Sequence, residues 1–189
     1  MNSQQKIILA SRSPRRQQLL ADAGFRFEIV VKDTDESFPA TLPPAEVAEF
    51  LARQKADAFT EAEIAEAILI TADTVVVLDT QVLNKPADPH VAFQMLSQLS
   101  GRVHEVYTGV CLRKNGKIVS FTDRTRVHFK TFEPTEINFY IEHYMPFDKA
   151  GAYGAQDWLG LVGIERIEGS YFNVMGLPTH RLYTALKEF

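Results

Sequence analysis

The chain has 189 residues, and its 24 acidic and 20 basic side chains give a formal net charge of −4 at pH 7. Apolar residues make up 46% and charged residues 23%, so the chain can bury a core without disulfides, which excludes disordered and fibrous classes. The acidic balance excludes a broad nucleic-acid-coating surface, which needs a basic excess. Any anionic ligand must therefore meet a local group of cations.

The single cysteine, Cys111, lies in an apolar stretch, which excludes an intrachain disulfide and a cysteine-built zinc site. Neither a signal-peptide pattern nor a run of about 18 apolar residues occurs. We therefore expect a cytoplasmic protein with no membrane partner. The five histidines are scattered, without a pair four residues apart. We interpret them as surface or edge residues and assign them no metal.

The chain begins with a predicted strand over 6–10 and a helix over 15–23. Ser13 is the expected N-cap of this helix, Pro14 suits its first position, and Gly24 suits its C-terminal end. The further expected strands cover 25–31, 67–78, 103–112, 118–132 and 162–167. The further expected helices cover 43–59, 88–99 and 133–144, and a last one follows Pro178.

Asn115-Gly116, between two of these strands, is a strong signal for a two-residue hairpin turn. No repeat, low-complexity tract or long linker divides the chain. We therefore predict a single domain over residues 1–189, of mixed α/β class, with a β-sheet flanked by helices. The long hairpin is expected to build a second lobe, and the order of the elements leaves the sheet topology open.

The segment Ser11-Arg12-Ser13-Pro14-Arg15-Arg16 places hydroxyls, helix-start N–H groups and guanidinium groups directly after a strand. Free N–H groups and the positive end of a helix favour a phosphate, and arginine binds its oxygens through two parallel hydrogen bonds. The P-loop pattern is absent from the chain. The alternative is an ordinary capped helix with solvated arginines.

Asp73 interrupts an apolar run from Thr71 to Val77. Burying an unpaired carboxylate costs roughly several kcal/mol. Asp73 must therefore have a cation, a metal or a hydrogen-bond network as its partner. A general base or a metal ligand would satisfy this requirement. The alternative is a strand that ends at Thr71, with Asp73 in a turn. Lys55 and Lys85, each taken alone, could be solvated lysines.

The acidic loop from Asp33 to Ser37 follows an apolar stretch, as in haloacid-dehalogenase-type phosphatases. The fifth position of that motif is Ser37 here, and the later paired aspartates of such phosphatases are missing. The carboxylates of the loop remain reasonable oxygen ligands for Mg²⁺.

Several segments, in order along nearly the whole chain, carry a family resemblance. They are Leu9 to Arg16, Ala48 to Lys55, Ala72 to Val76, Leu83 to Pro86, Leu99 to Gly101, Asp148 to Gln156 and Ile167 to Pro178. Together they resemble the Maf family of nucleoside triphosphate pyrophosphatases, relatives of the inosine-triphosphate pyrophosphatases. The resemblance implies an inosine-triphosphate-pyrophosphatase-like fold around a cleft.

The resemblance also implies a cytoplasmic and often dimeric enzyme. It would use water and a divalent metal, Mg²⁺ or Mn²⁺, to cut a nucleoside triphosphate into monophosphate and pyrophosphate. Asp73 is similar to the family's proton acceptor, and Glu36 to an acidic position of the cleft, which we assign to the metal. The positions similar to the family's phosphate-binding residues are Ser11, Arg16, Lys55 and Lys85.

Arg15, Thr74 and Gln156 are similar to the pattern of the subgroup that acts on dTTP and UTP. A side-chain amide can accept a hydrogen bond from N3–H and donate one to O4 of uracil or thymine. A rotated amide suits cytosine, and guanine also shows a donor beside an acceptor. The sequence Asp157-Trp158 departs from the glycine common in relatives, and it could reshape the base pocket.

Two other functions stay open from the sequence. One is a regulatory nucleotide-binding protein linked to septum formation, with which the family has been connected. The other is a haloacid-dehalogenase-type phosphatase, which would release orthophosphate. We expect no nucleic-acid partner for any of the three.

Overall fold

The computed structural model describes residues 5–189, in which strands alternate with helices. The strands are β1 (Ile7–Leu9), β2 (Glu28–Ile29), β3 (Ile68–Leu78), β4 (Gln81–Leu83), β5 (Val103–Lys114), β6 (Lys117–Phe129) and β7 (Ile164–Glu168). The α-helices are α1 (Pro14–Asp22), α2 (Pro44–Asp57), α3 (Glu61–Ile64), α4 (Pro89–Leu99), α5 (Pro134–Tyr144), α6 (Trp158–Gly163), α7 (Tyr171–Val174) and α8 (Thr179–Glu188). Two 3₁₀ turns are η1 (Pro146–Asp148) and η2 (Ala150–Ala152).

Within residues 5–189 the strands form a seven-stranded sheet in the order β2-β1-β3-β5-β6-β7, with β4 paired to β3. β1 is parallel to β2 and β3, whereas β4 is antiparallel to β3 and β7 is antiparallel to β6. The predicted mixed α/β class is confirmed. The predicted hairpin joins β5 to β6, where Asn115 and Gly116 both have positive φ, 48° and 76°.

The chain divides into two compact units. The first holds the chain up to Asp73, then 108–123 and 176–189, and the second holds 74–107 and 124–175. The tip of the β5–β6 hairpin therefore belongs to the first unit. The second unit contains the ends of that hairpin together with α4 to α7. The hairpin therefore forms only part of the second lobe that the sequence predicted.

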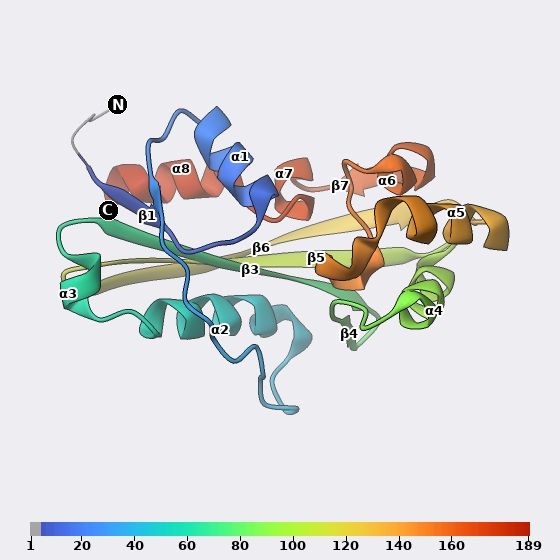
Figure 1. Ribbon diagram of the computed structural model, residues 1–189, viewed down its shortest axis with the longest axis horizontal. Helices are drawn as coiled ribbons and strands as arrows, with labels where there is room; N and C mark the ends of the chain where they lie inside the picture. Colours follow the sequence, from blue (N-terminus) through green and yellow to red (C-terminus); the bar gives the residue numbers. More distant parts are fainter. Residues whose placement is uncertain (1–4) are drawn as a thin grey trace. The chain divides into compact units, whose positions relative to one another are not determined.

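In the first unit, α1 and α8 lie on one side of the strands and α2 lies on the other (Figure 1). Buried residues of β1, α2 and β3 form a core that also contains Cys111, as its apolar surroundings predicted. Gly109 of β5 brings α2 very close to the sheet. A Cβ atom at Gly109 would lie 2.3 Å from backbone atoms of Ala48 and Glu49. The position of α2 on the sheet thus requires a glycine at residue 109.

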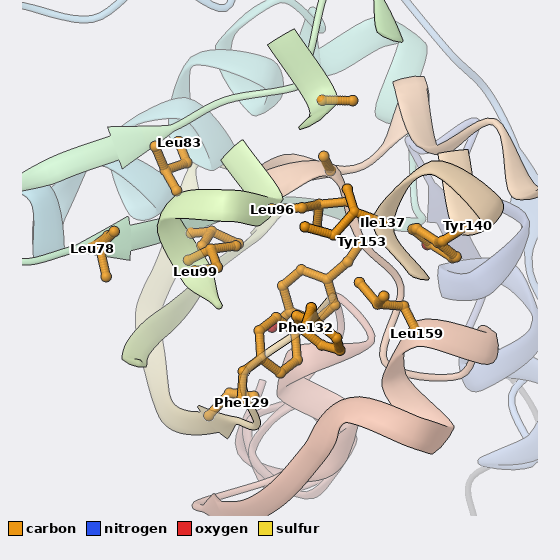
Figure 2. Close-up of a cluster of buried hydrophobic side chains, with 14 of the residues drawn as sticks. Leu78, Leu83, Leu96, Leu99, Phe129, Phe132, Ile137, Tyr140, Tyr153 and Leu159 are labelled. Atoms are coloured by element: carbon orange, nitrogen blue, oxygen red, sulfur yellow. The ribbon is translucent and has the colours of Figure 1, made fainter. Parts of the chain in front are cut away.

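In the second unit, α4, α5 and α6 enclose an aromatic core around Phe129, Phe132 and Tyr153 (Figure 2). The ring of Phe129 meets each of the other two edge to face, with centroid distances of 5.2 and 4.8 Å. Each such pair contributes roughly 0.5–1.5 kcal/mol of stability beyond the contribution of the apolar area that it buries.

His104 also belongs to this core, and the expectation that the histidines lie at the surface or an edge is wrong for it. The side chain is 1% exposed, and its Nε2 atom lies 2.7 Å from the hydroxyl of Tyr153. Burial lowers the pKa of His104 to about 3, so the imidazole is neutral at physiological pH. His104 is buried, whereas its neighbours Val103 and Glu105 along β5 are not. The rings of Phe129 and Tyr153 pack against its imidazole.

Most of the predicted elements are present, with boundaries that differ by a few residues. β2 is the main exception, since it covers only 28–29 instead of 25–31. The short elements α3, β4, α6 and α7 were not predicted, because each is at most six residues long and too short to show a period. In the described part of the chain, no helix is long and apolar enough to cross a membrane.

We expect Gly109→Ala to lower the free energy of unfolding by about 1–3 kcal/mol, because the added methyl group must push α2 away from β5. Urea unfolding followed by circular dichroism measures this change. An unfolding midpoint equal to that of the wild type would contradict the close packing of α2.

Candidate functional site

Asp73 lies in the middle of β3 and faces α2. Successive side chains of a strand alternate between its two faces, so Thr71 and Asp73 point the same way. The Thr71 hydroxyl donates a hydrogen bond of 2.6 Å to the carbonyl of Ala52 in α2, which fixes the direction of this face. β3 continues through Asp73 to Leu78, so the alternative in which the strand ends at Thr71 is wrong.

Lys55 lies three residues after Ala52 on α2 and bridges two carboxylates. Its Nζ atom is 2.5 Å from Oδ1 of Asp73 and 2.9 Å from Oε1 of Glu36. The Lys55 and Asp73 side chains are only 15% and 12% exposed, whereas Glu36 is 45% exposed. The buried carboxylate that the sequence left without a partner is therefore paired with an ammonium group. The structure brings together three of the predicted site residues.

Arg16 of α1 holds the backbone beside Asp73. Its Nε atom donates to the carbonyl of Gly176 at 2.8 Å, and Nη1 donates to the carbonyl of Ala72 at 2.9 Å. The N–H of Ala10, just after β1, still donates to Ile70 in β3. The guanidinium group thus supplies the donor for the next carbonyl along the same edge of β3, where the short strand β1 has already ended.

The Arg16 guanidinium also lies within the electrostatic field of the two carboxylates. Burial lowers the pKa of Arg16, and the charge of Asp73 opposes that shift. Arg15 adds to the lowering of the pKa, whereas Glu36 raises it. The predicted cations of the first unit, Arg15, Arg16 and Lys55, therefore share one electrostatic environment with both predicted carboxylates.

The hydroxyl groups before α1 shape the start of this helix. The Oγ atom of Ser13 accepts the N–H of Arg16 at 3.5 Å, which confirms Ser13 as the predicted N-cap. The Oγ atom of Ser11 in turn accepts the N–H of Ser13 at 3.2 Å, and Ser11 is only 5% exposed. These contacts set the direction in which α1 leaves β1.

Three predicted site residues belong to the second unit. Thr74 follows Asp73 in β3, and Lys85 is an exposed residue after β4. Gln156 lies in the turn before α6, and its Oε1 atom is buried without a hydrogen-bond partner among the residues that the structure describes. Buried polar atoms are nearly always paired, so this acceptor is an exception within its turn.

Glu36 and Asp73 offer oxygen atoms to a common cation, and hard divalent cations prefer such oxygens. This arrangement fits a hard divalent cation as well as the ammonium group that lies there. No cluster of three or more histidine, cysteine, aspartate or glutamate side chains suited to a metal occurs among residues 5–189. A metal at this place must therefore draw on few protein ligands.

Comparisons with known proteins point in one direction. The profile of the family described as "Maf-like protein" matches residues 6–189. A curated relative from Porphyromonas gingivalis, named dTTP/UTP pyrophosphatase, is 46% identical over 187 residues, which cover 97% of this chain and 94% of that protein. The relative of the same name from Bacteroides thetaiotaomicron is 46% identical over 184 residues, with 97% and 95% covered.

A third curated relative of that name, from Cytophaga hutchinsonii, is 48% identical over 182 residues, with 96% of this chain and 83% of that protein covered. The solved structure of the Staphylococcus aureus Ham1 protein matches with a TM-score of 0.46 and 11% identity, over 66% of this chain and 72% of that one. We draw no conclusion from this structural similarity, because both the TM-score and the identity are low.

We expect the Lys55–Asp73 pair to show a coupling energy of about 1–3 kcal/mol in a double-mutant cycle of Lys55→Met and Asp73→Asn, because both side chains are largely buried. Thermal or urea unfolding of the four proteins, without added metal, measures it. The exposed pair Arg12–Asp33, whose side chains are 71% and 88% exposed, is the control and should couple by less than about 1 kcal/mol. Equal coupling in the two pairs would contradict the assignment of Lys55 as the partner of the buried carboxylate.

Proposed function

The chain belongs to the Maf family, and on that basis we propose that it is a nucleoside triphosphate pyrophosphatase that hydrolyses dTTP and UTP. The products are the nucleoside monophosphate and pyrophosphate. The observation that carries this proposal is the ammonium group of Lys55 between the carboxylates of Asp73 and Glu36. A reaction at a polyphosphate needs cations to hold the phosphates and an anion beside the attacking water, and this cluster contains both.

Asp73 is the proposed proton acceptor. It is fixed by β3 and by its contact with Lys55, so its carboxylate is held in place before a substrate arrives. A water molecule that loses a proton to this carboxylate becomes the nucleophile, and the bond between the α- and β-phosphate groups breaks as pyrophosphate leaves. Correct placement of the water and the charge around it supply most of the catalysis in reactions of this kind.

The proposed phosphate-binding residues are Ser11, Arg16, Lys55 and Lys85. Lys55 is a flexible point charge that can move from the carboxylates to a phosphate oxygen. Arg16 holds the carbonyl groups of Ala72 and Gly176, so its guanidinium group is already fixed in direction. A preorganised guanidinium group binds an anion without a large loss of side-chain entropy.

A divalent cation, Mg²⁺ or Mn²⁺, is the proposed cofactor, and Glu36 with Asp73 would hold it. When bound, such an ion offsets the negative charge of the phosphates and strengthens their binding. Glu36 is the more exposed of the two carboxylates, so its oxygen atoms would be the more accessible to such an ion.

Gln156 is the proposed base-recognition residue, with Arg15 and Thr74 as further specificity residues. Its buried, unpartnered Oε1 atom can accept the N3–H of uracil or thymine. The N3 atom of cytosine carries no hydrogen and would leave this acceptor unpaired, which costs binding energy. An amide that presents its oxygen atom to N3 would thus favour dTTP and UTP over CTP.

The phosphatase alternative is poorly supported by the surroundings of Asp33. The side chain is 88% exposed and paired with Arg12, and β2 ends four residues before it. A nucleophilic aspartate of a phosphatase would instead follow directly from a buried strand. The regulatory alternative predicts tight nucleotide binding without turnover, and the retained cluster of Asp73, Lys55 and Glu36 favours turnover.

We further propose one functional domain over residues 1–189, active in the cytoplasm as a homodimer. The family match over 6–189 supports the single domain, and the free, buried Cys111 suits a reducing compartment. Large apolar side chains that are exposed in the second unit, such as Met145 (64%) and Leu161 (77%), support a subunit contact. A single-chain mass in light scattering would reject the dimer.

We expect the purified protein with Mg²⁺ to release pyrophosphate, and no orthophosphate, from dTTP and UTP. The Asp73→Asn variant should lower kcat by about 10²- to 10⁴-fold, because the carboxamide cannot take a proton from water. Coupled assays for the two phosphate products measure both quantities. Orthophosphate as the first product would refute the reaction, and a kcat near that of the wild type in Asp73→Asn would remove Asp73 as the base.

We expect Gln156→Ala to lower kcat/KM for UTP and dTTP by roughly tenfold or more relative to CTP, because the N3–H of the base loses its acceptor. Steady-state kinetics on a panel of triphosphates measures the ranking. Gln98→Ala, at an exposed glutamine of α4, is the matched control and should keep the ranking of the wild type. An unchanged ranking in Gln156→Ala would rule out its role in base recognition.

A further inference from the structure

Gln156 is the third residue of a four-residue turn that is closed by its backbone. The N–H of Asp157 donates a hydrogen bond of 3.1 Å to the carbonyl of Gly154, which joins the first and fourth residues of the turn. Gly160 of α6 supports the turn from its other side, where an added Cβ atom would lie 2.1 Å from the carbonyl oxygen of Ala155. The backbone on both sides of Gln156 is therefore held closely.

The hydroxyl group of Tyr140 ties both ends of this turn together. It accepts the N–H of Gly154 at 3.1 Å and donates its own proton to Oδ2 of Asp157 at 2.9 Å. Tyr140 is 0% exposed, and burial, followed by the charge of Asp157, raises its pKa. The hydroxyl therefore keeps its proton at any physiological pH, and the direction of both hydrogen bonds is set.

The carboxylate of Asp157 is used in an unusual way. Asp157 is the N-cap residue of α6, yet its side chain makes no capping hydrogen bond and turns to Tyr140 instead. It lies so close to Gly154 that a Cβ atom there would be 2.5 Å from Oδ2. The ammonium group of Lys149, 3.6 Å away, offsets its charge, and both side chains are less than 20% exposed.

We infer that Asp157 is a positioning residue for base selection. It acts through its hydrogen bond with Tyr140, which holds the turn that carries Gln156. The inference rests on the proposed function, since it assigns the selectivity of that same site. The carboxylate is turned to the Tyr140 hydroxyl. It fixes the backbone from which the Gln156 amide projects, and so it keeps the buried Oε1 atom of that amide in one place.

A fixed acceptor discriminates between bases better than a mobile one. When the turn is loose, Gln156 can shift as a whole, and its amide then has room to offer its NH₂ group to the N3 atom of cytosine. An amide on a rigid turn loses binding energy with cytosine, because its buried acceptor stays unpaired. The network of Asp157, Tyr140 and Lys149 thus raises selectivity without a contact to the ligand.

The test is the ratio of kcat/KM for UTP to that for CTP, measured in Asp157→Ala, Tyr140→Phe and Asp157→Asn. In the first two variants the ratio should fall roughly tenfold, mainly through a higher KM for UTP, because a loosened turn misplaces the acceptor. The kcat for CTP should stay within about threefold. Asp157→Asn keeps an acceptor for the Tyr140 hydroxyl and should retain a ratio within about threefold of the wild type.

Two controls separate positioning from general damage to the fold. Asp148→Ala removes another carboxylate that pairs with Lys149, at 2.8 Å, and Tyr144→Phe removes the hydroxyl of an exposed tyrosine one turn along α5. Both should keep the ratio of the wild type. The ratio does not depend on the folded fraction, because unfolded protein lowers turnover of UTP and CTP equally.

Each outcome bears on a separate claim. A wild type that releases no pyrophosphate from UTP overturns the proposed function before any variant is made. A ratio that falls in Gln156→Ala but not in Asp157→Ala or Tyr140→Phe overturns only the positioning role. An equal fall in Asp148→Ala would overturn it as well, since that variant leaves the Tyr140 hydrogen bonds intact.

Discussion

The carboxylate of Asp73, set in an otherwise apolar strand, is the constraint on which the first unit depends. Its charge is tolerated in β3 because the Lys55 ammonium group lies 2.5 Å away. That contact requires α2 to lie in a definite register on the sheet. The register in turn depends on the hydrogen bond from Thr71 to Ala52 and on the bare Cα of Gly109. Core packing and the chemistry of the site are therefore one requirement in this unit.

In the second unit, the turn from Gly154 to Asp157 lies outside any regular helix or strand and is held by other contacts. Backbone groups in a turn lack the regular partners that a helix or a sheet provides. Here the hydroxyl of a buried tyrosine from α5 accepts a backbone N–H of the turn, and a carboxylate of the same turn accepts the proton of that hydroxyl. The tyrosine itself lies in the hydrophobic core of this unit (Figure 2). Rigid loops on a packed scaffold are where binding residues are commonly found.

Sequence reasoning predicted the long elements, the Ser13 cap and the hairpin turn, because each has a local signal of period, cap or turn residue. It also identified Asp73 as a residue that needs a partner, yet it could not show that Lys55 is that partner. Contacts of that kind join residues far apart in the chain and leave no local pattern. The burial of His104 and the isolated acceptor of Gln156 depend on neighbours from several elements, so neither could be read from its own segment.

Lys55 also determines what the protein needs in order to fold. In many metal proteins the ligands repel one another until the ion binds, and the apo chain is unfolded. In this chain the ammonium group of Lys55 already offsets part of the charge of the two carboxylates, before any metal binds. The carboxylates therefore do not need a metal ion as their partner in the folded chain, and we expect the chain to fold before the proposed cofactor binds.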